Sequence, residues 1–231
     1  MLDIYADTAD LVGIRAARAN PSIKGFTTNP TLMRAAGVTD YEWFAKEAQK
    51  LSDGQPISFE VFSDDFKEME RQARKLAALG KNVYVKIPIT DTKGESTAPV
   101  IEALSNDLIP LNVTAVFTPH QVTAAARAMH QNCPAIISIF AGRIADSGVD
   151  PVPIMKQAVN SCRWKSNIKV LWASAREVLN IKQADSSGCH IITLTPELIK
   201  KSASLGKPLD KFSLETVQMF YNDAKASGFH L

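Results

Sequence analysis

The stretch Val83-Tyr84-Val85-Lys86-Ile87-Pro88-Ile89 places a lysine in the middle of bulky apolar residues. Such a run is typical of a β-strand, whose alternation points Lys86 to one face and Val83, Val85 and Ile87 to the other. A lysine in a strand is most often a solvated residue at a sheet edge. Here we expect both faces to be covered. Burial favours the neutral amine, which is the nucleophile that forms Schiff bases with carbonyl compounds.

Similar β-rich runs recur along the whole chain. They begin roughly 21 to 34 residues apart, which is the length of a strand, a loop and a crossover helix. Amphipathic helical stretches lie between them, for example at 64–79 and 121–130. The runs are LDIYAD from Leu2, IKGFT from Ile23, ISFEVF from Ile57, VYVKIPI from Val83, LNVTAVF from Leu111, AIISIF from Ala135, IKVLWAS from Ile168 and HIITLT from His190.

Strands that alternate with helices throughout a chain form parallel sheets. Eight such units in 231 residues fit a closed barrel better than an open doubly wound sheet, and no glycine-rich phosphate loop follows the first run. We therefore predict the α/β class, with a single (β/α)8 TIM barrel domain over residues 1–231. An extra helix is predicted at 212–229, and its apolar residues indicate that it docks against another surface, such as a neighbouring subunit.

The composition restricts the function. The net charge of +2, without a basic cluster, makes nucleic acid a poor partner. The three cysteines and four histidines have no metal-ligand spacing, so a metal-dependent aldolase is disfavoured. The first residues do not resemble a signal peptide, and no stretch is long and apolar enough for a membrane span. We expect a cytoplasmic protein that does not bind membranes.

Polar residues share the inward face of several predicted strands. Catalytic residues of such barrels come from the carboxyl ends of strands, and buried charged groups need partners. These residues suit Schiff-base cleavage of a ketose. A neutral Lys86 attacks the ketone, and Glu60 and Thr114 supply an acid and a positioned water for dehydration. Asp7 is the base at the hydroxyl beside the cleaved bond. The inward residues are Asp7, Glu60, Lys86, Asn112, Thr114, Ser138, Trp172 and Ser174.

At these positions the chain resembles the transaldolase family, in the short-chain branch that includes the fructose-6-phosphate aldolases. The resemblance covers essentially the whole chain, and each motif lies at a predicted strand end. The motifs are Asp7-Thr8-Ala9-Asp10, Thr27-Thr28-Asn29-Pro30-Thr31-Leu32, Val85-Lys86-Ile87-Pro88, Leu111-Asn112-Val113-Thr114, Ile137-Ser138-Ile139-Phe140-Ala141-Gly142-Arg143-Ile144 and Ala173-Ser174-Ala175-Arg176.

The resemblance implies a role for each matched residue. It makes Lys86 the Schiff-base lysine and Asp7 the acid/base, and it makes Glu60 and Thr114 the pair that holds the catalytic water. It implies a sugar-phosphate substrate and no cofactor or metal. The implied substrate contacts are Asn29, Asn112 and Ser138 around the dihydroxyacetone part of the donor, and Arg143, Ser174 and Arg176 around the phosphate. We also expect Thr27, Phe140 and Trp172 to contact the substrate.

Two positions favour a transferase within the family. Fructose-6-phosphate aldolases tend to carry glutamine and tyrosine where this chain has Glu60 and Phe140. The leading prediction is a transaldolase that moves a dihydroxyacetone unit from sedoheptulose 7-phosphate or fructose 6-phosphate to an aldose phosphate. The alternatives are a Schiff-base aldolase or isomerase acting on a related sugar phosphate, and a non-catalytic barrel.

The chain also departs from the family pattern. Trp172 stands where a small residue is usual, so it either fills the barrel or narrows the pocket near the phosphate and changes the accepted sugar. Ile139 stands where proline is common. We also expect a homo-oligomer, with a pentamer or a decamer as candidate states, joined through the C-terminal helix.

Overall fold

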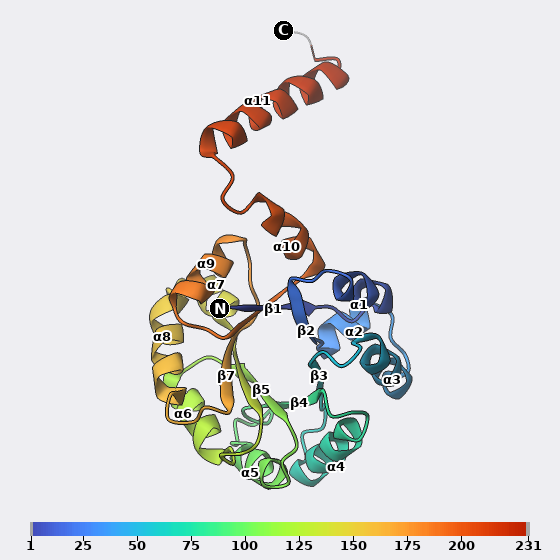
Figure 1. Cartoon of the computed structure of the whole chain (residues 1–231), viewed down its shortest axis with the longest axis vertical. Helices are drawn as coiled ribbons and strands as arrows, with labels where there is room; N and C mark the ends of the chain where they lie inside the picture. The colour runs from blue at the N-terminus through green and yellow to red at the C-terminus, as the bar shows by residue number, and fades with distance from the viewer. Residues whose placement is uncertain (1, 230–231) are drawn as a thin grey trace.

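The computed structural model describes residues 2–229, and its centre is a closed barrel of eight parallel strands (Figure 1). Each strand pairs with the next one in the chain, and β8 pairs with β1 to close the ring. The predicted (β/α)8 barrel is therefore confirmed. The strands are β1 (Asp3–Asp7), β2 (Ile23–Thr27), β3 (Ile57–Glu60), β4 (Val83–Pro88), β5 (Leu111–Val116), β6 (Ala135–Ile139), β7 (Ile168–Trp172) and β8 (Ile191–Leu194).

Helices surround the barrel, and two short ones were not predicted. These two are α2 (Pro30–Ala35) after β2 and α7 (Ala141–Asp146) after β6, each placed before the longer helix of its unit. The other helices are α1 (Leu11–Arg18), α3 (Tyr41–Leu51), α4 (Phe66–Ala77), α5 (Ala98–Asn106), α6 (Pro119–Ala128), α8 (Pro151–Cys162), α9 (Leu179–Ser186), α10 (Pro196–Lys201), the 3₁₀ turn η1 (Ser202–Ser204) and α11 (Leu209–Ala226).

Strand β4 has the two faces that its alternation predicts. Val83, Val85 and Ile87 are fully buried in the large apolar core between the barrel and the helices. Tyr84 and Lys86 belong to the other parity and point into the barrel, where Tyr84 packs against a smaller inner cluster. One strand therefore serves both as core and as the support of a buried cation.

The lower part of the barrel interior is filled by side chains. Tyr5 is the largest member of the inner cluster, with Ile136, Leu171 and Ile191 around it. Gly25 on the neighbouring strand makes room for the Tyr5 ring, because a Cβ atom at Gly25 would lie 2.7 Å from two ring carbons. These side chains fill the barrel at the amino-terminal ends of the strands, so that the cavity and its polar groups lie at the carboxyl ends.

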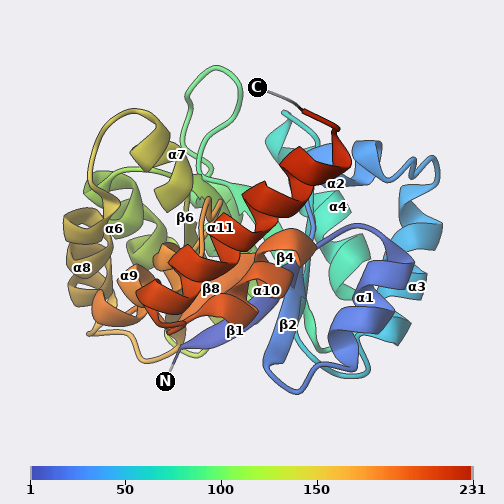
Figure 2. The same ribbon diagram turned by 90° about the horizontal axis from the view of Figure 1, so that it is seen from above.

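The C-terminal helix α11 stands apart from the barrel, beyond α10 (Figure 1). In the view from above it crosses in front of the barrel (Figure 2). None of its residues is buried, although Phe212, Leu214, Val217 and Phe220 are large and apolar. The predicted extra helix is confirmed, and it begins three residues earlier than the range expected from the sequence. Within residues 2–229, no helix has the length and apolar character needed to cross a membrane.

Candidate active site

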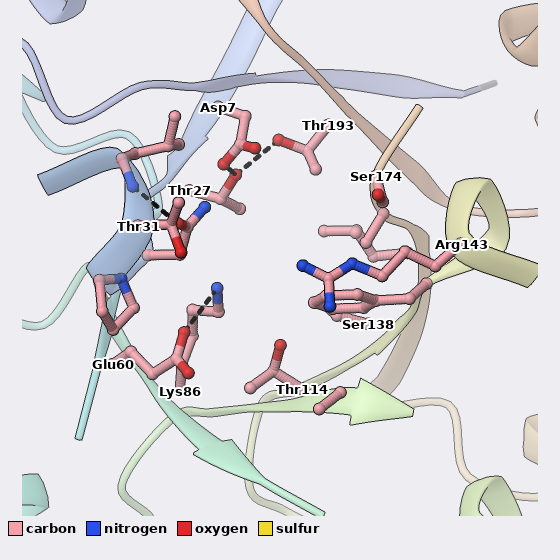
Figure 3. A pocket seen from close by; sticks show the side chains of 17 residues that line it. Asp7, Thr27, Thr31, Glu60, Lys86, Thr114, Ser138, Arg143, Ser174 and Thr193 are labelled. Atoms are coloured by element: carbon pink, nitrogen blue, oxygen red, sulfur yellow. Dashed lines mark hydrogen bonds and ion pairs between the residues drawn. The ribbon is translucent and has the colours of Figure 1, made fainter. Parts of the chain in front are cut away.

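A pocket of about 430 Å³ lies at the carboxyl ends of the strands (Figure 3). All eight strands contribute at least one lining side chain, so groups far apart in the sequence meet within one cavity. The lining residues are Asp7, Thr27, Asn29, Pro30, Thr31, Leu32, Glu60, Lys86, Thr114, Ala115, Ser138, Phe140, Arg143, Leu171, Ala173, Ser174 and Thr193.

Lys86 is the buried cation of this pocket. Its side chain is 6% exposed, and its Nζ lies 3.1 Å from Oε2 of Glu60. Nζ also donates a hydrogen bond to the carbonyl oxygen of Thr28 at 2.8 Å. A buried ammonium needs such partners to offset its lost hydration. Glu60 is near enough to accept a proton from Lys86, which leaves the amine lone pair free to attack a carbonyl carbon.

Tyr41 at the start of α3 holds the strand end that carries Glu60. Its hydroxyl donates a hydrogen bond to the backbone carbonyl of Glu60 at 2.7 Å. Burial, and next the charge of Glu60, raises the pKa of Tyr41 above its ordinary value, so the hydroxyl stays protonated as a donor. The Glu60 side chain is thus fixed from its backbone as well as by Lys86.

Asp7 ends a chain of hydroxyl groups. Thr27 donates a hydrogen bond to Oδ1 of Asp7 at 2.7 Å, and the Thr27 and Thr193 hydroxyls are 2.6 Å apart. Burial raises the pKa of Asp7 above its usual value, while the charge of Lys86 and the Thr27 hydrogen bond act in the opposite direction. An acid balanced in this way is suited to exchanging a proton with a substrate hydroxyl.

Thr193 is a pocket residue that the sequence pattern did not single out. It is 5% exposed on β8, and its hydroxyl is the outer partner of Thr27. Since Thr27 donates its single hydrogen to Asp7, Thr193 must be the donor between the two threonines. The alternation of the run from His190 places Thr193 on the inward face, which could have identified it. A lone threonine in a short strand, however, gives no indication of its hydrogen-bond partners.

Ser138 and Asn112 form a second polar pair near Lys86. Ser138 donates to Oδ1 of Asn112 at 2.6 Å, and Nδ2 of Asn112 donates to the Ser58 hydroxyl at 3.0 Å. Asn112 is completely buried and does not line the pocket itself, whereas Ser138 does. Asn112 therefore orients Ser138 from behind in this structure.

Thr114 presents an unpaired hydroxyl to the pocket. Its Oγ1 is buried and lacks a hydrogen-bond partner among the described residues. The next residue, Ala115, has φ of 57° at a register irregularity between β5 and β6, and it also lines the pocket. Buried hydroxyls are normally paired, and left-handed alanine is costly, so both features are typical of a functional site.

Phe140 and Arg143 form the wall on the β6 side. The guanidinium carbon of Arg143 lies 5.3 Å from the centre of the Phe140 ring, in a cation–π contact. Phe117 contacts the same ring, with 5.7 Å between the ring centres. The stacking holds Arg143 over the pocket, and within residues 2–229 it has no carboxylate partner within ion-pair distance.

Trp172 does not line the pocket, and its predicted position beside Ser174 is wrong. It is fully buried in the core between the barrel and the helices, on the outward parity with Val170. Leu171 and Ala173 occupy the inward positions instead. The alternation fails because Ser174 has φ of 62°, which turns its side chain into the pocket just beyond the strand.

Arg176 is also outside the pocket lining. Its guanidinium binds Asp146 of α7, with Nε 3.1 and 3.2 Å from the two carboxylate oxygens and Nη2 2.5 Å from Oδ2. The two side chains are about half exposed. Of the two arginines expected at the phosphate, the structure therefore places Arg143 at the pocket and Arg176 on a neighbouring acid.

Asn29 lies at the pocket rim as the residue that precedes helix α2. Its Oδ1 accepts a hydrogen bond from the backbone N–H of Leu32 at 2.9 Å, which caps the helix. Pro30 follows at the first helical position, where its missing N–H has no cost. The cap fixes the Asn29 oxygen and leaves its amide nitrogen to contact a ligand.

Among residues 2–229, no histidine or cysteine lines the pocket. No group of three His, Cys, Asp or Glu residues that could hold a metal occurs within residues 2–229. His120 is the second residue of α6, as its predicted helix-start position requires, while His230 lies outside the described residues. The three cysteines are free and buried, and burial raises the pKa of each thiol to about 11.

Comparison with known proteins identifies the family. The model for "Transaldolase/Fructose-6-phosphate aldolase" matches residues 4–231. The chain belongs to this family. It is 36% identical to a probable transaldolase of Thermoanaerobacter sp. (strain X514) over 84% of this chain and 85% of the other. A probable transaldolase of Desulfatibacillum aliphaticivorans is 33% identical, covering 97% of this chain and all of the other, and one of Hyphomonas neptunium is 33% identical over the full length of both.

Solved structures of other enzymes share the barrel of this transaldolase/aldolase family member. A thiamine phosphate pyrophosphorylase from Pyrococcus furiosus superposes with a TM-score of 0.56 at 13% identity, over 84% of this chain and 85% of the other. A mandelate oxidase mutant reaches 0.57 at 14% identity, over 84% of this chain and 64% of the other. At such low identity the likeness is one of fold alone.

Proposed function

We propose that the chain is a transaldolase that transfers a dihydroxyacetone unit between sugar phosphates through a Schiff base on Lys86. The observation that carries the proposal is the buried Lys86 Nζ, 3.1 Å from Glu60, in a pocket that also holds Asp7 and Thr114. An amine nucleophile, two acids and an unpaired hydroxyl are the groups that carbonyl condensation and retro-aldol cleavage require.

Schiff-base formation begins when Glu60 takes a proton from Lys86. The amine then attacks the ketone carbon, and the carbinolamine loses its hydroxyl as water after protonation by Glu60. Thr114, whose buried hydroxyl has no protein partner among the described residues, holds this water beside Glu60. The product is a protonated imine, which serves as the electron sink for the next step.

Cleavage follows when Asp7 removes the proton from the hydroxyl on the carbon beyond the breaking bond. The carbon–carbon bond breaks, an aldose phosphate leaves, and the electron pair moves into an enamine on Lys86. An incoming aldose phosphate accepts that pair at its aldehyde carbon, and Asp7 returns the proton to the new hydroxyl. Hydrolysis of the imine then releases the new ketose phosphate and restores the amine.

The donor is held on two sides of Lys86. Ser138, oriented by Asn112, is assigned to the dihydroxyacetone hydroxyls, together with Thr27 and the free amide nitrogen of Asn29. Arg143, stacked on Phe140, is assigned to the phosphate, with the Ser174 hydroxyl beside it. A guanidinium suits this task because its planar donors match phosphate oxygens.

Phe140 favours transfer over net aldol cleavage. The enamine has two fates, which are attack on an aldehyde and protonation followed by release of dihydroxyacetone. Phe140 lines the pocket with an apolar ring that offers no proton and excludes water. Sedoheptulose 7-phosphate and fructose 6-phosphate are the proposed donors, and an aldolase or isomerase acting on a related sugar phosphate is the alternative.

Product analysis with and without an acceptor separates these functions. Fructose 6-phosphate is supplied alone or together with erythrose 4-phosphate, and both free dihydroxyacetone and sedoheptulose 7-phosphate are measured. A transaldolase gives sedoheptulose 7-phosphate rapidly and releases little dihydroxyacetone without the acceptor. Release of dihydroxyacetone without the acceptor that is as fast as transfer with it would establish the aldolase instead.

We also propose that the protein is a homo-oligomer in which a second copy covers α11. Most of the stability of a protein helix comes from packing of its apolar face, and α11 has no buried residue of its own. Its exposed apolar side chains include Phe212, Val217 and Phe220. Light scattering should give a multiple of 25.2 kDa, with a pentamer or decamer expected, and Val217→Glu with Phe220→Glu should lower the mass. A wild-type monomer would refute this.

A cytoplasmic location remains part of the proposal. The three free, buried cysteines support it, since thiols persist in reducing compartments. Fractionation of the cells that make the protein would test it, and recovery with an exported marker enzyme would refute it.

A further inference from the structure

Arg176 does not line the pocket, but it follows the pocket residue Ser174 by two positions, and its side chain extends from there to Asp146. A Cβ atom on Gly142 would lie 3.3 Å from Cγ of Arg176 and 1.6 Å from the backbone oxygen of Ser174. The Arg176 stem therefore passes directly over Gly142, which precedes the pocket residue Arg143. Its guanidinium, however, binds Asp146, four residues and about one helical turn further along α7.

The contact with Asp146 uses one edge of the guanidinium. Both Nε and Nη2 bind the Asp146 carboxylate, which is the bidentate geometry that arginine also uses for phosphate. Arg143 differs, because within residues 2–229 it has no acidic partner and stacks on Phe140 over the pocket. Of the two arginines, Arg143 is thus available to bind an anion, whereas Arg176 is already paired with Asp146.

We infer that Asp146 is a specificity-determining residue that competes with the substrate phosphate for Arg176. This inference rests on the proposed function. Rotation about the last side-chain bonds of Arg176, whose stem already lies beside Gly142, brings its guanidinium toward the phosphate, and Asp146 loses its partner. The reverse movement occurs when a sugar phosphate leaves.

Competition of this kind lowers the affinity for the phosphate of donor and product alike. Transfer requires an aldose phosphate to leave after cleavage and a ketose phosphate to leave at the end. A guanidinium with an alternative anionic partner releases each of them more readily than one with no other partner. Binding given equally to bound substrate and transition state does not raise kcat, so Asp146 can weaken it without slowing the chemical step.

The test is Asp146→Asn, which removes the competing charge and keeps the shape. Calorimetry with inorganic phosphate should show roughly two- to fivefold tighter binding, the range expected for loss of an exposed ion pair. KM for fructose 6-phosphate should fall by a similar factor, while KM for unphosphorylated dihydroxyacetone as donor should stay the same. Asp146→Glu should restore the wild-type values.

Two controls isolate the Arg176 contact. Asp53→Asn removes the acid from another exposed pair, in which Asp53 Oδ2 lies 2.6 Å from Arg18, and it should leave phosphate binding unchanged. In an Arg176→Ala background, Asp146→Asn should lose its effect, because the pair interacts only through Arg176. Thermal unfolding of each variant shows that it is folded.

Weaker or unchanged phosphate binding by folded Asp146→Asn would overturn the inference, since Asp146 would then position Arg176 or leave it unaffected. The same gain in the Arg176→Ala background would also overturn it. The proposed function fails separately, when wild-type enzyme transfers no dihydroxyacetone unit. Phosphate calorimetry does not depend on turnover, so the two failures are distinguishable.

Discussion

The two sides of the pocket are built differently. On the β1–β5 side, Asp7, Glu60 and Lys86 lie on strands, and each makes a hydrogen bond or ion pair with a neighbouring strand or its following loop. On the β6–β7 side, Arg143 and Arg176 are exposed residues of a short helix and a loop. Strands hold reacting groups within a fraction of an ångström, whereas exposed arginines can follow a charge. The proposed function thus assigns bond-making to the rigid side and phosphate recognition to the adjustable side.

The largest expected effect on the rigid side comes from Asp7→Asn. Loss of a general acid/base should lower kcat by about 100- to 10,000-fold, while KM for fructose 6-phosphate changes little. Steady-state kinetics with erythrose 4-phosphate as acceptor measures this. A loss of less than tenfold would show that Asp7 does not handle the proton.

The same variant should be more stable than wild type at neutral pH. The folded-state pKa of Asp7 is raised by burial, so the folded protein holds a proton that the unfolded chain releases above its ordinary value near 3.8. The free energy of unfolding therefore falls as the pH rises from the unfolded-state pKa of Asp7 to its higher folded-state pKa. Asparagine does not titrate, so it removes this loss. Denaturant unfolding should show a gain for Asp7→Asn near pH 7 that shrinks toward pH 4. A constant difference across this range would contradict the assignment.

On the adjustable side, Arg143→Ala should affect binding more than chemistry. Loss of a charge-assisted contact costs about 1.5–3 kcal/mol, or roughly ten- to a hundredfold in KM for phosphorylated donors. Unphosphorylated dihydroxyacetone should react as before. Arg176→Ala should have the smaller effect of the two, because part of its phosphate contact replaces the pair with Asp146. An equal loss with both donors would place Arg143 in the chemistry instead.

Thr193→Val examines how the rigid side is aligned. Without the Thr193 hydroxyl, Thr27 is less firmly directed at Asp7, and one neutral hydrogen bond corresponds to about a two- to tenfold loss in kcat. The Thr27 hydrogen bond lowers the pKa of Asp7, so weakening it should move the acid limb of the kcat profile to higher pH. Thr193→Ser should restore both. A loss of rate with an unmoved profile would indicate a merely structural role.

Phe140→Tyr is the smallest change and examines the border between the two sides. A hydroxyl at this position can position a proton donor for the enamine, so free dihydroxyacetone should form faster from fructose 6-phosphate without acceptor. Addition of Glu60→Gln should increase the effect. Dihydroxyacetone assayed with and without erythrose 4-phosphate gives the ratio of release to transfer. An unchanged ratio in both variants would remove Phe140 from the account.

The sequence predicted the rigid side well because strand periodicity carries spatial information. Alternation around Lys86 assigned its neighbours to the outer core and Lys86 to the interior, as the structure has them. The same reasoning failed at Trp172, because the positive φ of Ser174 ends the alternation after β7. Nothing in the residue pattern announces that change, since serine rarely adopts this conformation.

The adjustable side was predicted only in part, because exposed loops and short helices lack a periodic signal. Asp146, at the end of α7, and its partner Arg176 are 30 residues apart in the sequence, and no sequence pattern links them. Thr193 shows a similar limit within a strand, since its parity was visible but its 2.6 Å contact with Thr27 depends on how β8 closes onto β1 and β2.

The proposed function requires a covalent bond between Lys86 and the donor, and borohydride trapping detects that bond. Wild-type enzyme incubated with fructose 6-phosphate and reduced should gain the mass of a three-carbon dihydroxyacetone fragment, and peptide mapping should place it on Lys86. Lys86→Arg keeps the positive charge, but arginine stays protonated and cannot form the imine, so this variant should gain no mass. An unmodified wild-type chain, or the same added mass on Lys86→Arg, would contradict the account.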